Sequence, residues 1–303
     1  MTPLSSRQGP LDWAVDGPHW PHAGRSGFVT AGGLRWHVQT WPGPAPDAPA
    51  LLLLHGTGAS THSWRGLAPR LAARWRVIAP DLPGHAFTGL PPGGAADPRL
   101  SLPGMAGAVA DLVAALSVTP DLVVGHSAGA AVAVQMALAG RCLPRRLVGL
   151  NAALLPLGGL VGPLFRPLAR LVAAAPGVPR LAAWQTRQPA VLRGLIDSTG
   201  SRLDAEGTAL YRRLVASAVH HEGVLGMMAQ WDLPGLARAL PGLAVPLDLL
   251  VGLADATVPP AQAAEVMQRL APAVRGALHA LPALGHLAHE EDPAAVATWL
   301  LGR

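Results

Sequence analysis

The chain has 303 residues, half of them hydrophobic, with 35 glycines and 31 prolines. This composition predicts an enzyme-sized domain with a large buried core and many turns, and it argues against disorder. The formal net charge is +5, and all 23 basic residues are scattered arginines. We therefore expect no nucleic-acid partner, while a mild attraction to an anionic membrane surface or an acidic partner stays open.

The sequence also bears on location. No run of about 20 apolar residues predicts a transmembrane helix. Residues 1–10 lack the apolar stretch of a signal peptide, and the single Cys142 agrees with a reducing compartment. We therefore expect a cytoplasmic protein, with peripheral contact at a membrane as an option.

Strand and helix patterns alternate along most of the chain. The predicted strands cover residues 34–41, 50–54, 76–80, 122–124, 146–150, 247–253 and 277–281, and the predicted helices cover 62–73, 104–116, 130–137, 261–270 and 292–301. This alternation is typical of an α/β fold with a mostly parallel sheet flanked by helices.

The pentapeptide Gly125-His126-Ser127-Ala128-Gly129 lies between an apolar strand and a helix of small residues. Glycines allow the strand and the helix to pack tightly at a sharp turn, which holds the serine in a strained backbone conformation. The pattern resembles the nucleophile elbow of the α/β-hydrolases, which implies an eight-stranded sheet. Ser127 is therefore the predicted nucleophile, and His126 beside it is predicted to border the substrate.

Residues 153–240 interrupt the alternation with apolar helical pieces and several prolines. Because α/β-hydrolases carry a cap after the sixth strand, we predict a helical cap here, on a core of residues 1–152 and 241–303. Met227, Met228 and Trp231 are predicted to line a hydrophobic substrate pocket beneath it. The alternative is that these side chains only pack the cap onto the core.

Two arginines of the predicted cap, Arg166 and Arg170, are four residues apart and so share one helix face. They are candidates for contact with a substrate carboxylate or with an anionic membrane surface. Ordinary solvated charges are the alternative.

A serine nucleophile needs a base within hydrogen-bonding reach. His286 follows Gly285 just after the last predicted strand, with Glu291 five residues later and Pro293 two beyond that. This spacing is typical of the catalytic-histidine loop of the superfamily. His289 is the local rival, but no glycine precedes it.

The base needs a carboxylate to orient it, and Asp255 stands at the end of a predicted strand, where side chains emerge at the active-site edge of the sheet. Asp248 is the rival, although it lies inside that strand. Some α/β-hydrolases place the acid after the sixth strand, but Asn151 stands there. Asp255 is therefore the predicted acid, with a loop-capping role as the alternative.

The loop His55-Gly56-Thr57-Gly58 follows an apolar strand, so its backbone N–H groups can face a developing negative charge. We predict an oxyanion hole formed by the backbone N–H groups of Thr57 and Ala128, with Gly58 as the alternative first donor. Gly56 and Gly58 are also predicted to border the substrate.

Cofactor signals are weak. The twelve histidines are dispersed, and none joins a cysteine or carboxylate cluster at zinc spacing. No glycine-rich phosphate loop follows a strand. We therefore expect no metal and no cofactor.

Five strings together resemble one branch of the α/β-hydrolases: HGTGASTHSWR (55–65), APDLPGHAFT (79–88), GHSAGAA (125–131), MMAQWDL (227–233) and LGHLAHEE (284–291). It is the BchO type, the magnesium-chelatase accessory proteins of bacteriochlorophyll biosynthesis. The resemblance covers the chain from about Trp20 onwards. One departure is Ala86, where such proteins usually carry glycine, so the loop there is open to reshaping.

The resemblance implies a place in magnesium-tetrapyrrole biosynthesis, with hydrolysis as its chemistry and association with magnesium chelatase as an option. We expect a serine hydrolase acting on a hydrophobic ester or a tetrapyrrole. The alternative is a non-catalytic accessory or tetrapyrrole-binding protein, although a binder has no need of a complete triad. A C–C hydrolase or perhydrolase would use the same residues. A haloalkane dehalogenase is excluded, because its nucleophile is an aspartate.

Overall fold

The computed structural model describes residues 9–156 and 177–302. Arg166 and Arg170 lie outside these residues. The centre of the fold is an eight-stranded sheet with the order β1-β2-β4-β3-β5-β6-β7-β8, in which β1, β2 and β4 pair antiparallel and the other pairs are parallel. The strands are β1 (Ser26–Ala31), β2 (Leu34–Trp41), β3 (Ala50–Leu54), β4 (Arg76–Pro80), β5 (Pro120–His126), β6 (Arg146–Leu150), β7 (Leu247–Gly252) and β8 (Arg275–Leu281). The predicted mostly parallel sheet is confirmed.

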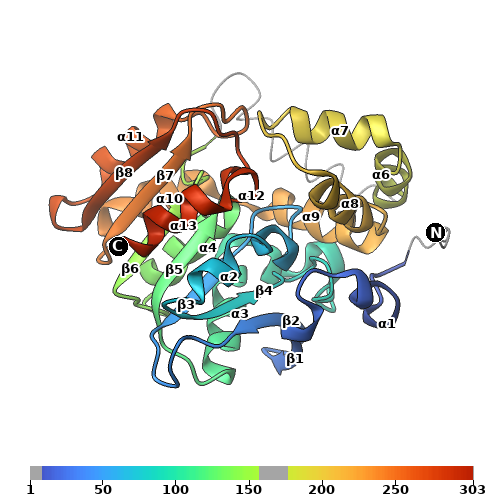
Figure 1. Ribbon diagram of the computed structural model, residues 1–303, viewed down its shortest axis with the longest axis horizontal. Helices are drawn as coiled ribbons and strands as arrows, with labels where there is room; N and C mark the ends of the chain where they lie inside the picture. Colours follow the sequence, from blue (N-terminus) through green and yellow to red (C-terminus); the bar gives the residue numbers. More distant parts are fainter. Residues whose placement is uncertain (1–8, 157–176, 303) are drawn as a thin grey trace.

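Helices cover both faces of this sheet (Figure 1). The α-helices are α1 (Trp13–Asp16), α2 (Ala68–Leu71), α3 (Leu102–Ala115), α4 (Ala128–Leu138), α6 (Val178–Thr186), α7 (Pro189–Asp197), α8 (Ala205–Val215), α9 (Ala218–Gln230), α10 (Leu233–Ala239), α11 (Ala261–Arg269), α12 (Ala288–Glu291) and α13 (Pro293–Leu301). The 3-10 helices are η1 (Gly17–His19), η2 (Ala23–Arg25), η3 (Thr61–Trp64), η4 (Gly94–Ala96), η5 (Pro98–Leu100), η6 (Leu240–Gly242) and η7 (Pro272–Val274).

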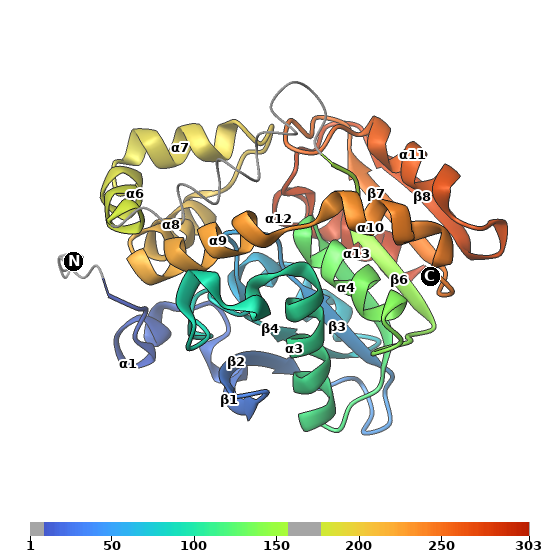
Figure 2. The ribbon, with the colours of Figure 1, turned by 180° about the vertical axis from the view of Figure 1, so that it is seen from behind.

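The two faces of the sheet form two apolar cores. Successive side chains of a strand point to opposite faces, so Leu52 and Leu54 of β3 enter one core while Leu51 and Leu53 enter the other. The first core is closed by α3, α4, α10 and α11, and the second by α2 and α13. Figure 2 shows α3 and α4 in front of the sheet, whereas Figure 1, seen from the opposite side, shows α2 and α13 in front of it. Burial on both faces explains why β3 is an unbroken apolar run.

Two details of the predicted elements differ from the structure. The helix predicted for residues 62–73 is wrong as one element, because the chain forms η3 and then the short α2. Gly66 lies between them and packs against Pro293, and the ring of Pro69 removes a helical hydrogen-bond donor at the start of α2. The strand β1 was not predicted. Its signal is the two-residue turn Gly32-Gly33, in which both residues have positive φ, as hairpin turns of this length require.

Helices α6 to α10 form an insertion between β6 and β7, which confirms the predicted helical segment after the sixth strand. Figures 1 and 2 show α6, α7 and α8 grouped to one side of the sheet. Within the described residues, no helix is long and apolar enough to cross a bilayer.

Several histidines are buried within this fold. His62, His85 and His126 are at most 2% exposed. Each imidazole lies in a weakly polar environment that disfavours its protonated form. Burial is the main cause that lowers the pKa of each of these three side chains from 6.5 to about 3. The folded protein therefore holds these rings neutral.

This burial predicts acid sensitivity. Above about pH 6.5 these histidines are neutral in both states, and they do not oppose folding. Below it, the unfolded chain binds protons that the folded protein does not, so the free energy of unfolding falls as the pH drops towards 3. Each such group contributes a slope of about 1.4 kcal/mol per pH unit. Urea unfolding between pH 7.5 and 5 measures the total slope.

A variant pair tests the assignment. His62→Gln removes one buried ring and should make the decline with pH shallower, whereas His19→Gln, at an exposed position, should leave it unchanged. Equal pH slopes for the His62→Gln variant and the wild type would contradict this explanation.

Candidate active site

Ser127 occupies the sharp turn between β5 and α4. Its backbone is strained, with φ 51° and ψ −116°, and its N–H donates to the Leu150 carbonyl at the end of β6 (3.0 Å). A Cβ on Gly129 would overlap the carbonyl of Leu54, and one on Gly125 would overlap the backbone of Ala130. Only glycines allow this approach of helix and strand. The turn holds the serine hydroxyl at the carboxyl end of the central strand β5, and 9% of the residue is exposed.

The structure brings Ser127, His286 and Asp255 together in one hydrogen-bonded chain. The Ser127 hydroxyl lies 2.9 Å from Nε2 of His286, and Nδ1 of His286 lies 2.8 Å from Oδ2 of Asp255. Because the carboxylate can only accept, the Nδ1–H donates to it and Nε2 is left to accept the proton of the serine. All three residues are buried. The arrangement can deprotonate the serine and stabilise the resulting imidazolium.

Asp255 is held as a carboxylate. Burial alone would raise its pKa, but hydrogen bonding and charge attraction from His286, together with further hydrogen bonds, outweigh burial and lower the pKa. The backbone N–H groups of Thr257 and Val258 both donate to Oδ1 (2.8 Å each). Oδ2 also accepts from the side-chain amide of Asn151 (2.8 Å), which donates to the Gly285 carbonyl as well (3.3 Å).

Asn151 is thus a site residue that the sequence reasoning noticed only as the absence of a carboxylate. It has φ 47°, a left-handed conformation in which asparagine is enriched. Its position directly after β6 is the signal that identifies it, since that strand end lies beside the strand that leads to Asp255.

The loop after β3 lies against Ser127. A Cβ on Gly56 would stand 2.7 Å from the His126 ring and 3.1 Å from the Cβ of Ser127, so the loop can approach only because residue 56 is glycine. Among the described residues, none accepts a hydrogen bond from the backbone N–H of Thr57 or of Ala128. His55 fixes the loop, because its Nδ1–H donates to the Gly56 carbonyl (2.8 Å) and its Nε2 accepts from Leu82 N–H (2.9 Å).

The rival residues lie elsewhere. His289 is fully buried between Trp64 and His126, with ring centroids 4.6 and 4.4 Å away, and neither of its nitrogens has a partner among the described residues. Asp248 is buried in β7, where its carboxylate accepts hydrogen bonds from the Arg146 side chain (2.7 Å) and from Ala277 N–H (2.7 Å). Neither residue is hydrogen-bonded to Ser127 or Asp255 in the described structure.

The insertion contacts the site through α9. His220 accepts from Ala86 N–H through Nδ1 (3.2 Å), and its Nε2–H donates to the Gly58 carbonyl (3.2 Å). Ala86 has a positive φ of 44°, a conformation that favours glycine. The hydroxyl of Thr57 donates to the sulfur of Met227 (3.6 Å).

The three predicted pocket residues differ in burial. Met227 is fully buried and Trp231 is 8% exposed, and both belong to the core that contains α3 and α4. Met228 is half-buried. Packing of the insertion onto the core therefore accounts for Met227 and Trp231, and contact with a substrate stays a prediction for all three.

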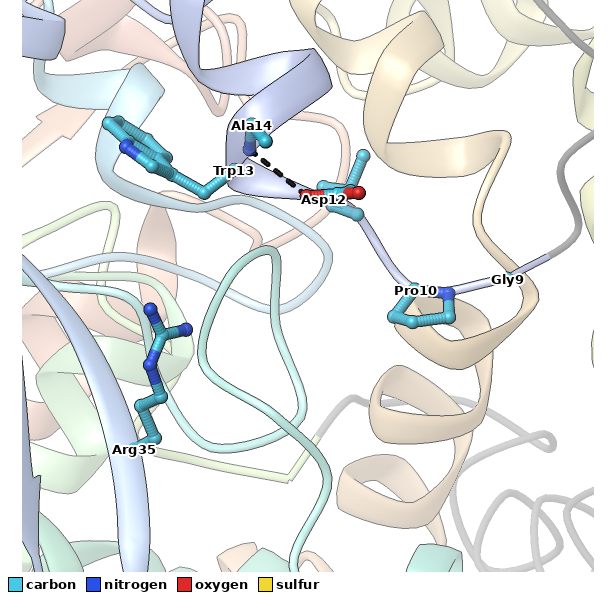
Figure 3. Close-up of a pocket in the computed structure, with 7 residues that line it drawn as sticks. Gly9, Pro10, Asp12, Trp13, Ala14 and Arg35 are labelled. Atoms are coloured by element: carbon cyan, nitrogen blue, oxygen red, sulfur yellow. Dashed lines mark hydrogen bonds between the residues drawn. The ribbon is translucent and has the colours of Figure 1, made fainter.

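Two cavities are resolved at the amino-terminal side of the molecule. The larger, about 660 Å³, is lined by Gly9 to Ala14 and Arg35 (Figure 3), and a second of about 400 Å³ lies between Gly9 and helices α6 and α9. Neither lining includes Ser127, Asp255 or His286. Within the described ranges, no three histidine, cysteine or carboxylate side chains are grouped as metal ligands would be.

Comparison with known proteins agrees with this fold. The family model described as "Alpha/beta hydrolase family" matches residues 51–299. The magnesium-chelatase 30 kDa subunit of Rhodobacter capsulatus is 42% identical over 276 residues, which are 90% of this chain and 92% of that protein.

Solved structures show the same fold at lower identity. An α/β-hydrolase-fold protein from Burkholderia ambifaria superposes with a TM-score of 0.74 at 22% identity, covering 91% of this chain and 97% of the other. A putative lipase from Acinetobacter baumannii gives a TM-score of 0.72 at 20% identity, with 91% and 89% covered. The chain belongs to the α/β hydrolase family, and it is similar to the Rhodobacter magnesium-chelatase subunit along most of its length.

Proposed function

We propose that the protein is a serine hydrolase that cleaves an ester of a hydrophobic substrate. The observation that carries the proposal is the chain of hydrogen bonds from Ser127 Oγ through His286 to Asp255, with distances of 2.9 and 2.8 Å. We assign residues 1–152 and 241–303 to the catalytic core and residues 153–240 to a cap. A protein that only binds a ligand has no need of this set beside the loop 55–58.

In the first half-reaction, Ser127 Oγ attacks the carbonyl carbon of the ester while its proton passes to His286 Nε2. The oxyanion that forms is stabilised by the backbone N–H groups of Thr57 and Ala128. The bond from the carbonyl carbon to the alkoxy oxygen then breaks, and the leaving alcohol takes the proton from His286. Asp255 stabilises the transient imidazolium and keeps Nε2 directed at the serine.

In the second half-reaction, water adds to the acyl carbon and its proton passes to His286 Nε2. The bond from that carbon to Ser127 Oγ breaks, the serine regains the proton, and the carboxylic acid leaves. No cofactor takes part in these steps.

Substitutions in the triad test the proposed hydrolase function. Ser127→Ala should abolish labelling by a fluorophosphonate probe and lower kcat for a short p-nitrophenyl ester by at least about 10³-fold. Asp255→Asn should lower kcat by up to roughly 10⁴-fold, because the amide favours the wrong tautomer of His286. Mass mapping of the labelled peptide and steady-state kinetics measure these effects.

Asp248→Asn is the matched control, since it changes a buried aspartate of β7, the strand that leads to Asp255. We expect it to alter stability and leave kcat near the wild-type value. Probe labelling that persists in the Ser127→Ala variant, or a larger kcat loss for Asp248→Asn than for Asp255→Asn, would refute the assignment.

The name of a relative suggests a substrate class. The relative that is 42% identical is named a magnesium-chelatase 30 kDa subunit. We propose that this chain acts in magnesium-tetrapyrrole biosynthesis, on a tetrapyrrole ester or another hydrophobic ester. The name of that relative also favours a second candidate, an accessory protein that binds a tetrapyrrole or the chelatase and carries out no chemistry.

Pigment binding separates these two candidate functions. Protoporphyrin and its magnesium form should bind saturably at micromolar concentration, measured by Soret absorbance and by quenching of tryptophan fluorescence. Met228→Gln, on the half-buried face of α9, should weaken this binding about tenfold through lost apolar contact. Leu138→Gln, at a half-buried position at the end of α4, is the control.

Binding with probe-reactive Ser127 supports the hydrolase. Binding with an unreactive Ser127 and no turnover would favour the accessory role. The absence of saturable binding for both pigments would remove the tetrapyrrole and leave a general ester hydrolase.

We also propose that the protein is cytoplasmic and contacts anionic membranes peripherally. Four large apolar side chains of α6 and α7 are 42–56% exposed: Leu181, Trp184, Val191 and Leu195. Arg180 and Arg193 are exposed on the same two helices. An indole among aliphatic side chains and arginines matches the interface of an anionic bilayer, where a poorly soluble substrate would also collect.

Binding to lipid vesicles tests this surface. Wild-type protein should sediment with vesicles of phosphatidylcholine and phosphatidylglycerol, less so at high salt. Trp184→Ser combined with Leu195→Ser should weaken binding by about tenfold or more. Leu143→Ser, which removes another exposed leucine, is the control. Equal binding by the double variant and the control would refute this surface.

A further inference from the structure

The segment Thr199–Arg202, which we call the strut, connects α7 with α8 in the insertion. It lies between the loop that carries Asp255 and the loop that carries His286. The carbonyl of Thr199 accepts two hydrogen bonds, one from Ala256 N–H and one from His286 N–H (3.2 Å each). One peptide group of the insertion therefore joins both loops.

The strut also accounts for the backbone donors on either side of His286. The Ser201 hydroxyl accepts from Leu287 N–H (2.8 Å). Glu291 accepts from Gly285 N–H through Oε2 (2.8 Å) and from Arg202 N–H through Oε1 (2.9 Å). Three consecutive N–H groups, from Gly285 to Leu287, are thus satisfied by the strut or by a carboxylate that also holds it.

The strut and the two loops pack so closely that residues 200 and 285 have no room for a side chain. Gly200 has φ 77°, and a Cβ on it would overlap the carbonyl of Ala254. A Cβ on Gly285 would overlap Gly200 and Ser201 Oγ. Ser201 itself is 1% exposed, so water cannot replace its hydroxyl at Leu287 N–H without rearrangement.

A second contact joins the insertion to the same loop. The Tyr211 hydroxyl of α8 donates to Glu290 Oε1 (2.8 Å), while Arg65 of the core pairs with Glu290 Oε2 (3.0 Å) and with Asp204 at the start of α8 (2.7 Å). Glu290 lies four residues after His286. The insertion therefore contacts the histidine loop both before the short helix α12, at residues 285–287, and within α12, at Glu290 and Glu291.

We propose that Ser201 and Thr199 are positioning residues of the active site, and that the insertion sets the orientation of His286. This inference rests on the proposed hydrolase function. From the core, the described contact to the His286 main chain is the hydrogen bond that the His286 carbonyl accepts from His126 Nε2–H (2.9 Å). A change in the insertion that shifts the strut would move His286 relative to Ser127 and Asp255, so the insertion would also tune the geometry of the site.

The experiment compares Ser201→Ala with Ser198→Ala. Ser198 lies just outside the strut, is exposed, and donates to the Leu195 carbonyl within its own helix. Glu291→Gln is a second variant, which retains the shape of the side chain and weakens one of its two accepted bonds. All variants are assayed well below their thermal midpoints, so that kcat refers to folded protein.

For Ser201→Ala we expect kcat for a p-nitrophenyl ester to fall roughly 10- to 100-fold with KM within threefold, since small misplacements of catalytic groups have effects of this size. The low-field proton resonance of His286 Nδ1–H should shift or broaden. Ser198→Ala should match the wild type in both measurements. A purely structural role would lower the thermal midpoint and leave kcat and the resonance unchanged.

The proposal is overturned if folded Ser201→Ala and Glu291→Gln proteins keep kcat within twofold and an unaltered Nδ1–H resonance. An inactive wild type that is unreactive towards the fluorophosphonate would instead refute the proposed hydrolase function. In that case the resonance still tests the strut, because it reports the His286–Asp255 hydrogen bond without turnover.

Discussion

The close crossing of β5 and α4 at Ser127 is the constraint on which the rest of the site depends. Gly129 lies against the Leu54 carbonyl, so the turn after β5 is locked to the end of β3. That contact sets the loop 55–58 beside the serine, and the Ser127 N–H bond to Leu150 fixes the same turn to β6. The strained backbone at Ser127 is therefore supported from both neighbouring strands.

Sequence reasoning succeeded where the signal is local. Runs such as 50–54 and 122–124 are apolar because both faces are buried, and that pattern needs no knowledge of the partner strands. It failed where an element depends on distant packing. Residues 62–73 have helical spacing, yet the chain forms η3 and the short α2 with Gly66 between them, where a Cβ would meet Pro293 of α13, more than two hundred residues later.

The same distinction applies to the site. Ser127, Asp255 and His286 each stand in a short motif, so they could be named from the sequence, and the structure places them in hydrogen-bonding distance. Asn151 and Ser201 have no motif of their own. Their importance arises from contacts across 104 and 86 residues of chain, with Asp255 and Leu287. Such contacts depend on how the loops and the insertion fold together, which no local pattern records.

His126 lies beside the triad as a neutral ring. His126 and His286 have ring centroids 4.8 Å apart, close enough for a charge on one ring to act strongly on the other. Burial, followed by the proximity of His286, lowers the pKa of His126 to about 3, so its ring stays neutral. The Nε2–H of this neutral His126 ring donates a hydrogen bond to the His286 carbonyl. The only full charge hydrogen-bonded to the His286 ring in the described structure is the Asp255 carboxylate, so the hydrogen-bonded chain that begins at Ser127 ends on a single negative charge.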